Sequence, residues 1–214
     1  MFHSNDLLVI GGGGHAKVII DILAQQKTFT LVGIIDRRDR MGQHLNGIPI
    51  IGDDSQLESF FRNGLRNAVI AIGDNQRRAD LYEILKKLGF NIVSIAHPSA
   101  VIAATVHLST GAAIMPGAVL NADCMVKENV IINTKASIDH DCRVMEHCHI
   151  APGCTLAGGV SVGAGTLLGA GTTVLPGIDI GAWSIIGAGS VVVSAIPDRV
   201  VAYGVPARII RHLD

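Results

Sequence analysis

Residues 119–154 read VLNADC MVKENV IINTKA SIDHDC RVMEHC HIAPGC when they are written in blocks of six. The second residue of every block is aliphatic, and the last is small or β-branched. Because an α-helix repeats near 3.6 residues and a half-buried strand near 2, neither produces a period of six. The pattern is typical of a left-handed parallel β-helix, in which short strands wind around a narrow prism. Followed in both directions, the aliphatic position recurs without interruption at Ile102, Leu108, Ile114, Leu120, Val126, Ile132, Ile138, Val144, Ile150, Leu156, Val162, Leu168, Val174, Ile180, Ile186 and Val192.

The composition agrees with a thin prism and restricts the partners. Aromatic residues make up 4% of the 214 residues, and the 25 glycines suit tight corners. The net charge of −1 offers no basic excess, so neither nucleic acid nor an anionic membrane surface is an expected partner. The chain has no CxxC pair and no histidines at metal-ligand spacing, so we expect no metal. Four cysteines occupy the small position of the repeat, where we expect them to be buried and reduced: Cys124, Cys142, Cys148 and Cys154.

One uncharged stretch is long enough to raise the question of a membrane span. Residues 151–178 carry no charged side chain, and a helix crosses a bilayer with roughly 20 residues. The stretch is rich in Gly and Thr, contains Pro152 and Pro176, and stays in phase with the repeat. We therefore predict coils of the β-helix and no membrane insertion. The N-terminus has no basic segment followed by an apolar run, so we expect a cytoplasmic protein.

Residues 1–97 do not follow the six-residue period and alternate between strand-like and helical patterns. We predict a Rossmann-like α/β domain there and a β-helix with a C-terminal tail over 98–214. The ligands of such a parallel sheet lie at the carboxyl ends of its strands. The predicted strands are 7–10, 31–35, 67–72 and 91–95, and the predicted helices are 15–26 and 76–88.

A glycine-rich turn indicates where this domain binds its ligand. Gly11 to Ala16 fit G-x-G-x-x-A, and Asp36 follows twenty residues later, which is the spacing of a dinucleotide fingerprint. A domain of about 95 residues lacks a second mononucleotide-binding half, so a nucleotide or sugar nucleotide is favoured over NAD. A turn needed only for helix–strand packing is the alternative, and His15 either contacts the ligand or caps the loop. The candidate binding residues are Gly13, Gly14, His15, Asp36, Arg37, Gly73, Asn75 and Arg78, the last of which we expect to reach a phosphate.

His140 is the candidate catalytic residue of the β-helix. It projects outward between Asp139 and Asp141, and an imidazole polarised by a carboxylate is a common general base near neutral pH. Gly158 stands eighteen residues later, one coil on, and its missing side chain leaves room beside the ring. The alternative is a surface histidine in a solvated charged patch. Either carboxylate is able to orient the imidazole.

Five motifs together resemble the sugar-nucleotide N-acetyltransferase family that includes PglD, NeuD and the perosamine N-acetyltransferases. The resemblance covers nearly the whole chain. It implies transfer of acetyl from acetyl-CoA to the 4-amino group of a nucleotide-linked 4-amino-4,6-dideoxy sugar. The motifs are IGGGGHAKV (10–18), AIGDNQRRADLY (71–82), HPSA (97–100), INTKASIDHDC (132–142) and GVPARII (204–210).

The resemblance also implies roles for individual residues. His140 matches the catalytic base of the family, Asp141 matches a neighbouring carboxylate that is Glu in some members, and Asn133 matches a site asparagine. The N-terminal domain is expected to bind the nucleotide. Acetyl-CoA is expected outside the β-helix, in a groove between two subunits of a homotrimer, along His149, Gly158, Ala170 and Ala188.

Several alternatives stay open. The nucleotide sugar is either a UDP-linked sugar of the bacillosamine pathway, which we favour, or GDP-perosamine. Some relatives act on hydroxyls, so O-acetylation of a sugar such as sialic acid is a second possibility. A non-catalytic nucleotide-sugar-binding trimer is a third. A dehydrogenase is a further alternative, which only the glycine motif supports.

Overall fold

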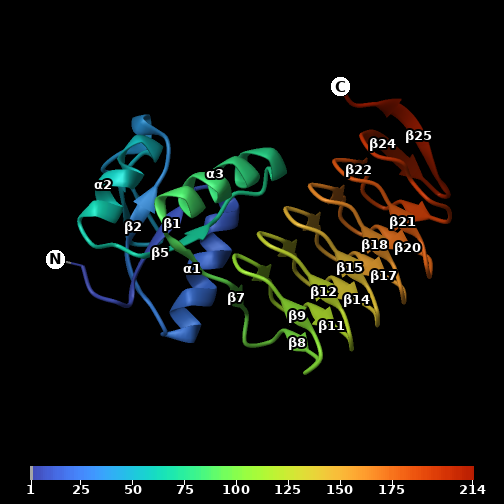
Figure 1. Cartoon of the computed structure of the whole chain (residues 1–214), viewed down its shortest axis with the longest axis horizontal. Helices are drawn as coiled ribbons and strands as arrows, with labels where there is room; N and C mark the ends of the chain where they lie inside the picture. Colours follow the sequence, from blue (N-terminus) through green and yellow to red (C-terminus); the bar gives the residue numbers. More distant parts are fainter. Residues whose placement is uncertain (1) are drawn as a thin grey trace. The chain divides into compact units, whose positions relative to one another are not determined.

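The computed structural model describes residues 2–214 and divides the chain into two compact units (Figure 1). The first unit ends at Ile95, and the second runs Ala96–Asp214. The first is the α/β unit, and the second contains the stacked short strands of the six-residue repeat. The α/β plus β-helix fold class predicted from the two periodicities is confirmed.

The α/β unit is built on one sheet in the order β3-β4-β2-β1-β5-β6. Its strands pair in parallel apart from β3, which forms an antiparallel hairpin with β4. Strand β1 (Asp6–Ile10) is buried along its whole length, as expected for a parallel strand covered on both faces. Its elements are β1 (Asp6–Ile10), α1 (Gly14–Gln26), β2 (Thr30–Ile35), η1 (Arg38–Arg40), β3 (His44–Leu45), β4 (Ile48–Gly52), η2 (Asp54–Gln56), α2 (Leu57–Arg62), β5 (Asn67–Ile70), α3 (Asn75–Leu88) and β6 (Asn91–Ile92).

The structure corrects the predicted elements at three places. Strand β5 ends at Ile70 rather than at residue 72, and the last predicted strand is split into β6 and a strand of the β-helix, β7 (Ile95–Ala96). Strands β3 and β4 and helix α2 were not predicted. Asn46-Gly47, both with positive φ, form the turn between β3 and β4, and this dipeptide is a strong hairpin signal.

In the second unit, each short strand up to Thr173–Val174 pairs in parallel with the strand eighteen residues further on, as Ser137 does with Thr155. Eighteen residues therefore form one coil, with one short strand on each side of the prism (Figure 1). One side contains β7, β10 (Ala113–Ile114), β13 (Ile131–Ile132), β16 (His149–Ile150), β19 (Leu167–Leu168) and β22 (Ile185–Ile186). The next contains β8 (Val101–Ile102), β11 (Val119–Leu120), β14 (Ser137–Ile138), β17 (Thr155–Leu156), β20 (Thr173–Val174) and β23 (Val191–Val192). The third contains β9 (His107–Leu108), β12 (Met125–Val126), β15 (Arg143–Val144), β18 (Ser161–Val162) and β21 (Asp179–Ile180). A hairpin of β24 (Val200–Gly204) and β25 (Ala207–His212) continues the first side beyond β22.

The interior of the prism is filled by the two positions that the repeat predicts. The aliphatic residues from Ile114 to Val192 are buried, whereas Leu108, in the first coil, is 38% exposed. The small residues are buried as well, and several are polar. The Cys148 thiol donates to the carbonyl of Gly163 (3.0 Å), and the Thr166 hydroxyl donates to the carbonyl of Gly181 (2.6 Å). Small S–H and O–H groups are tolerated inside because the next coil accepts their hydrogen bond. None of the four cysteines forms a disulfide.

Each corner of the coil needs one residue with a positive φ. Such residues recur at every sixth position from Gly111 to Gly189, and most are glycine. Where the position carries a side chain, Asp and Asn are among the residues that tolerate the left-handed region best. Asp141, with a φ of 59°, occupies one of these corners. The fold therefore fixes the backbone of a candidate site residue directly.

Residues 151–178 form coils of the β-helix, as predicted. Over the part of the chain that the structure describes, none of the helices combines the length and apolar character needed to cross a membrane.

Candidate functional site

The corner between β14 and β15 carries His140 and its two carboxylates, and each carboxylate has a different partner. The Asp141 carboxylate lies 2.8 Å from His140 Nδ1. Asp139 instead accepts the backbone N–H of His140 (2.9 Å) and the side-chain amide of Asn121 (2.9 Å). Asp141 thus orients the ring, while Asp139 holds the backbone of the corner.

The charges around the imidazole make it a stronger base than a free histidine. The pKa of His140 is raised, first by the hydrogen bond to Asp141 and then by the negative charge of Asp139. The pKa of Asp139 is lowered, first by the Asn121 amide and then by the His140 backbone N–H. The side chains of His140 and Asp141 are 61% and 66% exposed, so the ring is open to a substrate.

Gly158 lies beside the His140 ring, on the neighbouring coil. A Cβ at Gly158 would lie 2.5 Å from Cε1 and 2.6 Å from Nε2 of the imidazole. The coils are joined at this point by a hydrogen bond from the Gly159 N–H to the His140 carbonyl (2.9 Å). The ring therefore occupies the space that a side chain at residue 158 would need.

The corner after β13 brings two further candidate residues together. The Asn133 side-chain nitrogen lies 3.0 Å from His149 Nε2, and the Thr134 N–H donates to Asn133 Oδ1 (2.8 Å). Because the oxygen of the amide receives the Thr134 N–H, its NH₂ group faces the imidazole and donates to Nε2. In this arrangement Nε2 of His149 is the acceptor, which is its role in the tautomer that carries the proton on Nδ1.

Ala170 and Ala188 are both exposed, and they stand on adjacent coils joined by a hydrogen bond from the Gly189 N–H to the Ala170 carbonyl (2.8 Å). They follow β19 and β22, at the corner that also carries Asn133 after β13. His140 and Gly158 stand at the next corner of the coil. One prism thus carries the candidate base and Gly158 at one corner, and Ala170 and Ala188 at another.

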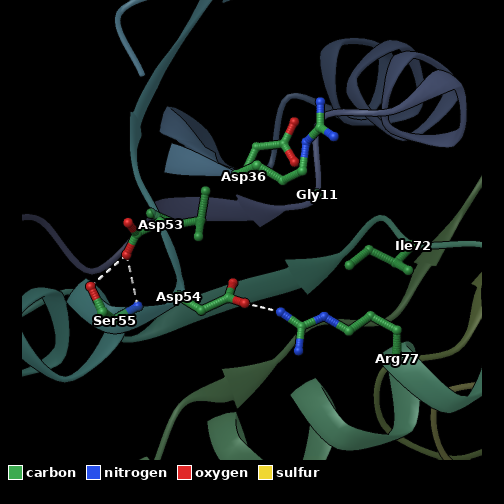
Figure 2. A pocket seen from close by; sticks show the side chains of 9 residues that line it. Gly11, Asp36, Asp53, Asp54, Ser55, Ile72 and Arg77 are labelled. Atoms are coloured by element: carbon green, nitrogen blue, oxygen red, sulfur yellow. Dashed lines mark hydrogen bonds and ion pairs between the residues drawn. The ribbon is translucent and has the colours of Figure 1, made fainter. Parts of the chain in front are cut away.

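A pocket of about 370 Å³ opens at the carboxyl ends of the α/β-unit strands, where the glycine motif predicts a ligand (Figure 2). Gly11 has a φ of 104°, and a Cβ there would lie 2.7 Å from Ile72 Cγ1. Only glycine therefore lets the turn pass this close to the segment after β5. The pocket is lined by Gly11, Ile35, Asp36, Arg37, Asp53, Asp54, Ser55, Ile72 and Arg77.

Asp36 is held by Arg40, an arginine that was not predicted as a site residue. Its carboxylate forms an ion pair with Arg40, whose guanidinium also donates to the Gly12 carbonyl (2.8 Å). Arg37 instead approaches Asp39 (3.5 Å), and both of those side chains are largely exposed. Asp36 and Arg40 are four residues apart, a spacing typical of ion pairs on an α-helix, and this spacing could have indicated the pair from the sequence. The segment that carries Arg40, η1, is however a 3-10 helix.

The start of α1 is open to a ligand. Gly13 precedes the helix and Gly14 begins it, and a Cβ at either position would have no neighbour within 4 Å. His15 lies in the first turn, where burial and then the charge of Arg78 lower its pKa to about 4. Its imidazole is therefore neutral at neutral pH.

The expectation that Arg78 reaches a phosphate is corrected by its burial. Arg78 is 1% exposed and donates to the carbonyls of Ile72 (3.2 Å) and Gly73 (3.1 Å) and to Asn75 Oδ1 (2.9 Å). It holds the turn that brings Gly73 and Asn75 to the start of α3. The preceding residue, Arg77, lines the pocket instead and forms an ion pair with Asp54.

Within residues 2–214, no three His, Cys, Asp or Glu side chains gather closely enough to hold a metal ion.

Comparison with known proteins identifies both units. Residues 6–85 match the family model described as PglD N-terminal domain, and residues 159–194 match the bacterial transferase hexapeptide (six repeats). The structure of PerB from Caulobacter crescentus, in complex with CoA and GDP-perosamine, is 44% identical. It superposes with a TM-score of 0.93 over 98% of this chain and 99% of that one. Structures of the same perosamine N-acetyltransferase with one histidine replaced by Asn or Ala match equally well.

Two further structures extend the comparison. The acetyltransferase domain of PglB from Neisseria gonorrhoeae, in complex with acetyl coenzyme A, is 32% identical. Its TM-score is 0.91, over 97% of this chain and all of that one (100%). WeeI from Acinetobacter baumannii is 25% identical, with a TM-score of 0.87 over 95% and 99% of the two chains. The predicted resemblance is confirmed, and the chain belongs to the family of hexapeptide-repeat sugar acetyltransferases with a PglD-type N-terminal domain.

Proposed function

We propose that this protein transfers the acetyl group of acetyl-CoA to the 4-amino group of a nucleotide-linked 4-amino-4,6-dideoxy sugar. The observation that carries the proposal is the exposed His140 imidazole, held by Asp141 at Nδ1 and flanked by Gly158. The sequence alone favoured a UDP-linked sugar. The 44% identity to an enzyme crystallised with GDP-perosamine supports a GDP-linked sugar as the first candidate.

The proposed reaction uses His140 as a general base. The sugar nitrogen attacks the thioester carbonyl, a C–N bond forms, and the nitrogen loses a proton to Nε2 of His140. The C–S bond then breaks, and the departing sulfur takes that proton and leaves as the CoA thiol. Asp141 accepts a hydrogen bond from Nδ1–H, which keeps Nε2 as the unprotonated nitrogen and stabilises the imidazolium that forms.

Acetyl-CoA binding is assigned to His149, Gly158, Ala170 and Ala188, and Asn133, whose amide contacts His149, is assigned to substrate binding. The small, exposed side chains of Ala170 and Ala188 on stacked coils leave a smooth track for an extended molecule. Because the Asn133 corner and the His140 corner belong to different edges of one prism, we assign the groove to two neighbouring subunits of a homotrimer.

The nucleotide is assigned to the α/β unit. The open backbone of Gly13 and Gly14 at the start of α1 suits the diphosphate, because the N–H groups of a helix start bind anions. Asp36, fixed by Arg40, suits the ribose hydroxyls. The four buried cysteines, which form no disulfide, support a reducing, cytoplasmic location.

Thiol release from acetyl-CoA tests the proposal. Purified protein is assayed with GDP- and UDP-linked 4-amino-4,6-dideoxy sugars and with their 4-hydroxy counterparts. Turnover with an amino sugar and none with its hydroxy counterpart is the expected result. Turnover with the hydroxy sugars alone would show O-acetylation, and nucleotide-sugar binding without any thiol release would show a non-catalytic binding protein; either would overturn the proposal.

A further inference from the structure

We propose that the ion pair between Asp54 and Arg77 reads the edge of the nucleotide base and selects guanine over uracil. This inference rests on the proposed function, because it assumes that the pocket of the α/β unit holds a nucleoside diphosphate. It assigns the discrimination between GDP- and UDP-linked substrates to two side chains.

The place of the pair in the sheet supports a contact with the base. In a doubly wound sheet the diphosphate lies at the first strand-to-helix turn, and the ribose lies at the carboxylate after the second strand. Here these are the turn after β1 and Asp36. The base then extends beyond Asp36, toward η2, which directly follows β4, the next strand outward.

Asp54 and Arg77 come from opposite sides of β1. Asp54 follows β4, Arg77 lies on α3 after β5, and β2 and β1 separate these strands in the sheet. Both side chains line the pocket, and their charged ends point toward each other across it (Figure 2). Their side chains are 38% and 49% exposed, so a ligand is able to reach both.

The carboxylates of the other two aspartates that line the pocket, Asp53 and Asp36, hold the local backbone or an arginine outside the pocket lining. Asp53 Oδ1 accepts the Ser55 N–H (2.9 Å) and the Ser55 hydroxyl (2.5 Å), and this capping arrangement holds the η2 turn. Asp36 is held by Arg40. Asp54 is therefore the carboxylate of the pocket that pairs with a pocket-lining guanidinium from a different element, Arg77 on α3.

The chemistry of the pair matches one base better than the other. Guanine presents an acceptor at O6 and two donors at N1–H and N2–H₂, so Arg77 donates to O6 and both Asp54 oxygens accept. Uracil offers a single donor, N3–H, to one oxygen of Asp54. The second oxygen of Asp54 then faces the lone pairs of uracil O2, and two acceptors form no hydrogen bond. Paired hydrogen bonds to a base edge discriminate by roughly tenfold to a hundredfold.

Binding of free nucleoside diphosphates tests the assignment without requiring catalysis. Affinities for GDP, IDP and UDP are measured by calorimetry on the full chain and on Asp54→Asn. Inosine retains O6 and N1–H but lacks the 2-amino group, so it isolates one of the two hydrogen bonds to Asp54. We expect the unaltered protein to bind GDP about tenfold or more tighter than either IDP or UDP.

The side-chain amide introduced by Asp54→Asn offers one acceptor and one donor, which match N3–H and O2 of uracil. We therefore expect the GDP preference over IDP to disappear and the preference over UDP to fall or reverse. The KM for the nucleotide sugar is expected to change by a larger factor than the kcat of acetyl transfer. Asp21→Asn, which alters an exposed carboxylate of α1 that accepts a hydrogen bond from Gln25 away from the pocket, is the matched control and is expected to keep the GDP preference.

Two results separate failure of this inference from failure of the proposed function. Equal affinities for GDP, IDP and UDP, together with acetyl transfer to an amino sugar, would overturn the role of Asp54 and Arg77 alone. Absence of binding by all three diphosphates, together with no turnover on any nucleotide sugar, would overturn the proposed function as well.

Discussion

Gly158 lies against the imidazole of His140, with a virtual Cβ 2.6 Å from Nε2. A methyl group there has to displace the ring, and because the ring is exposed it is free to swing away without disturbing the prism. Gly158→Ala is therefore expected to lower kcat/KM about 100-fold, since a misplacement near 1 Å has that effect. The thermal midpoint is expected to change little. Steady-state kinetics and thermal unfolding of the variant check both statements.

A double-mutant cycle controls for a direct effect of the new methyl group on acetyl-CoA. If Gly158 acts through His140, adding Gly158→Ala to a His140→Ala background will produce no further loss of turnover. Additive losses in the double variant would instead assign Gly158 a role independent of the imidazole.

His140→Ala removes the proposed base and is expected to reduce kcat by about 10²–10⁴-fold, the usual contribution of a general base. The ring is 61% exposed and makes no core contact, so the variant is expected to remain folded with an unchanged circular dichroism spectrum. His107→Ala, an exposed histidine on β9 of the same β-helix, is the matched control and is expected to retain full activity. Unchanged kcat/KM in His140→Ala would remove this residue from the mechanism.

Asp141→Asn is expected to change the pH profile. The hydrogen bond to Asp141 is the main cause of the raised His140 pKa, so removing the negative charge lowers that pKa. The unprotonated imidazole then persists to lower pH, and the acidic limb of the kcat/KM profile moves to lower pH. Its plateau falls, because a weaker base takes the proton less well.

The control for this shift is Asp123→Asn, which alters an aspartate at the same left-handed corner one coil earlier. It is expected to leave the profile where it is. An acidic limb that stays in place in Asp141→Asn would show that Asp139, rather than Asp141, sets the basicity of the ring.

The six-residue period was sufficient to predict the β-helix, because one aliphatic and one small inward residue in every six fill the three sides of a narrow prism. It also predicted the approach of Gly158 to His140, since residues one coil apart stack. It did not predict which carboxylate contacts the ring. That depends on the left-handed corner at Asp141, which turns this side chain toward Nδ1 and leaves Asp139 against the backbone.

The α/β unit was harder to predict because its pocket is assembled from segments without strong periodicity. Pro49 interrupts the pattern of β4, so the strand and the aspartates that follow it were not predicted. Arg77 and Arg78 are adjacent on α3, about 100° apart around the helix. Sequence alone does not decide which of the two faces the pocket, and the structure buries Arg78.

Asn133→Asp is expected to reverse the hydrogen bond to His149. One carboxylate oxygen still accepts the Thr134 N–H, so the other replaces the NH₂ group and faces Nε2. Only a protonated Nε2 satisfies that oxygen, so the proton on His149 changes place or a second proton is added. Nitrogen-15 shifts of the imidazole report this directly, and KM for acetyl-CoA is expected to rise. A shift pattern identical to that of the unaltered protein would refute the assigned tautomer. The matched control is Asn129→Asp, which alters the asparagine beside His147 and is expected to leave the His149 signals unchanged.

His15 makes the stability of the α/β unit depend on pH. Its pKa is lowered to about 4 in the folded protein, first by burial and then by Arg78, against an ordinary value of 6.5. Between these values the unfolded chain binds a proton that the folded chain refuses, so stability falls as pH drops from 6.5 toward 4. The loss at its fullest is about 3 kcal/mol.

His15→Gln removes this titration and is expected to flatten that part of the pH dependence. Hydrogen exchange of the buried β1 amides, followed from pH 7 to pH 4, reports the opening of this unit. His44→Gln, at an exposed position of the same unit, is the control and is expected to keep the slope of the unaltered protein. The same slope in His15→Gln would mean that other groups destabilise the unit in acid, whereas a flattened slope would establish His15 as its acid-sensitive residue.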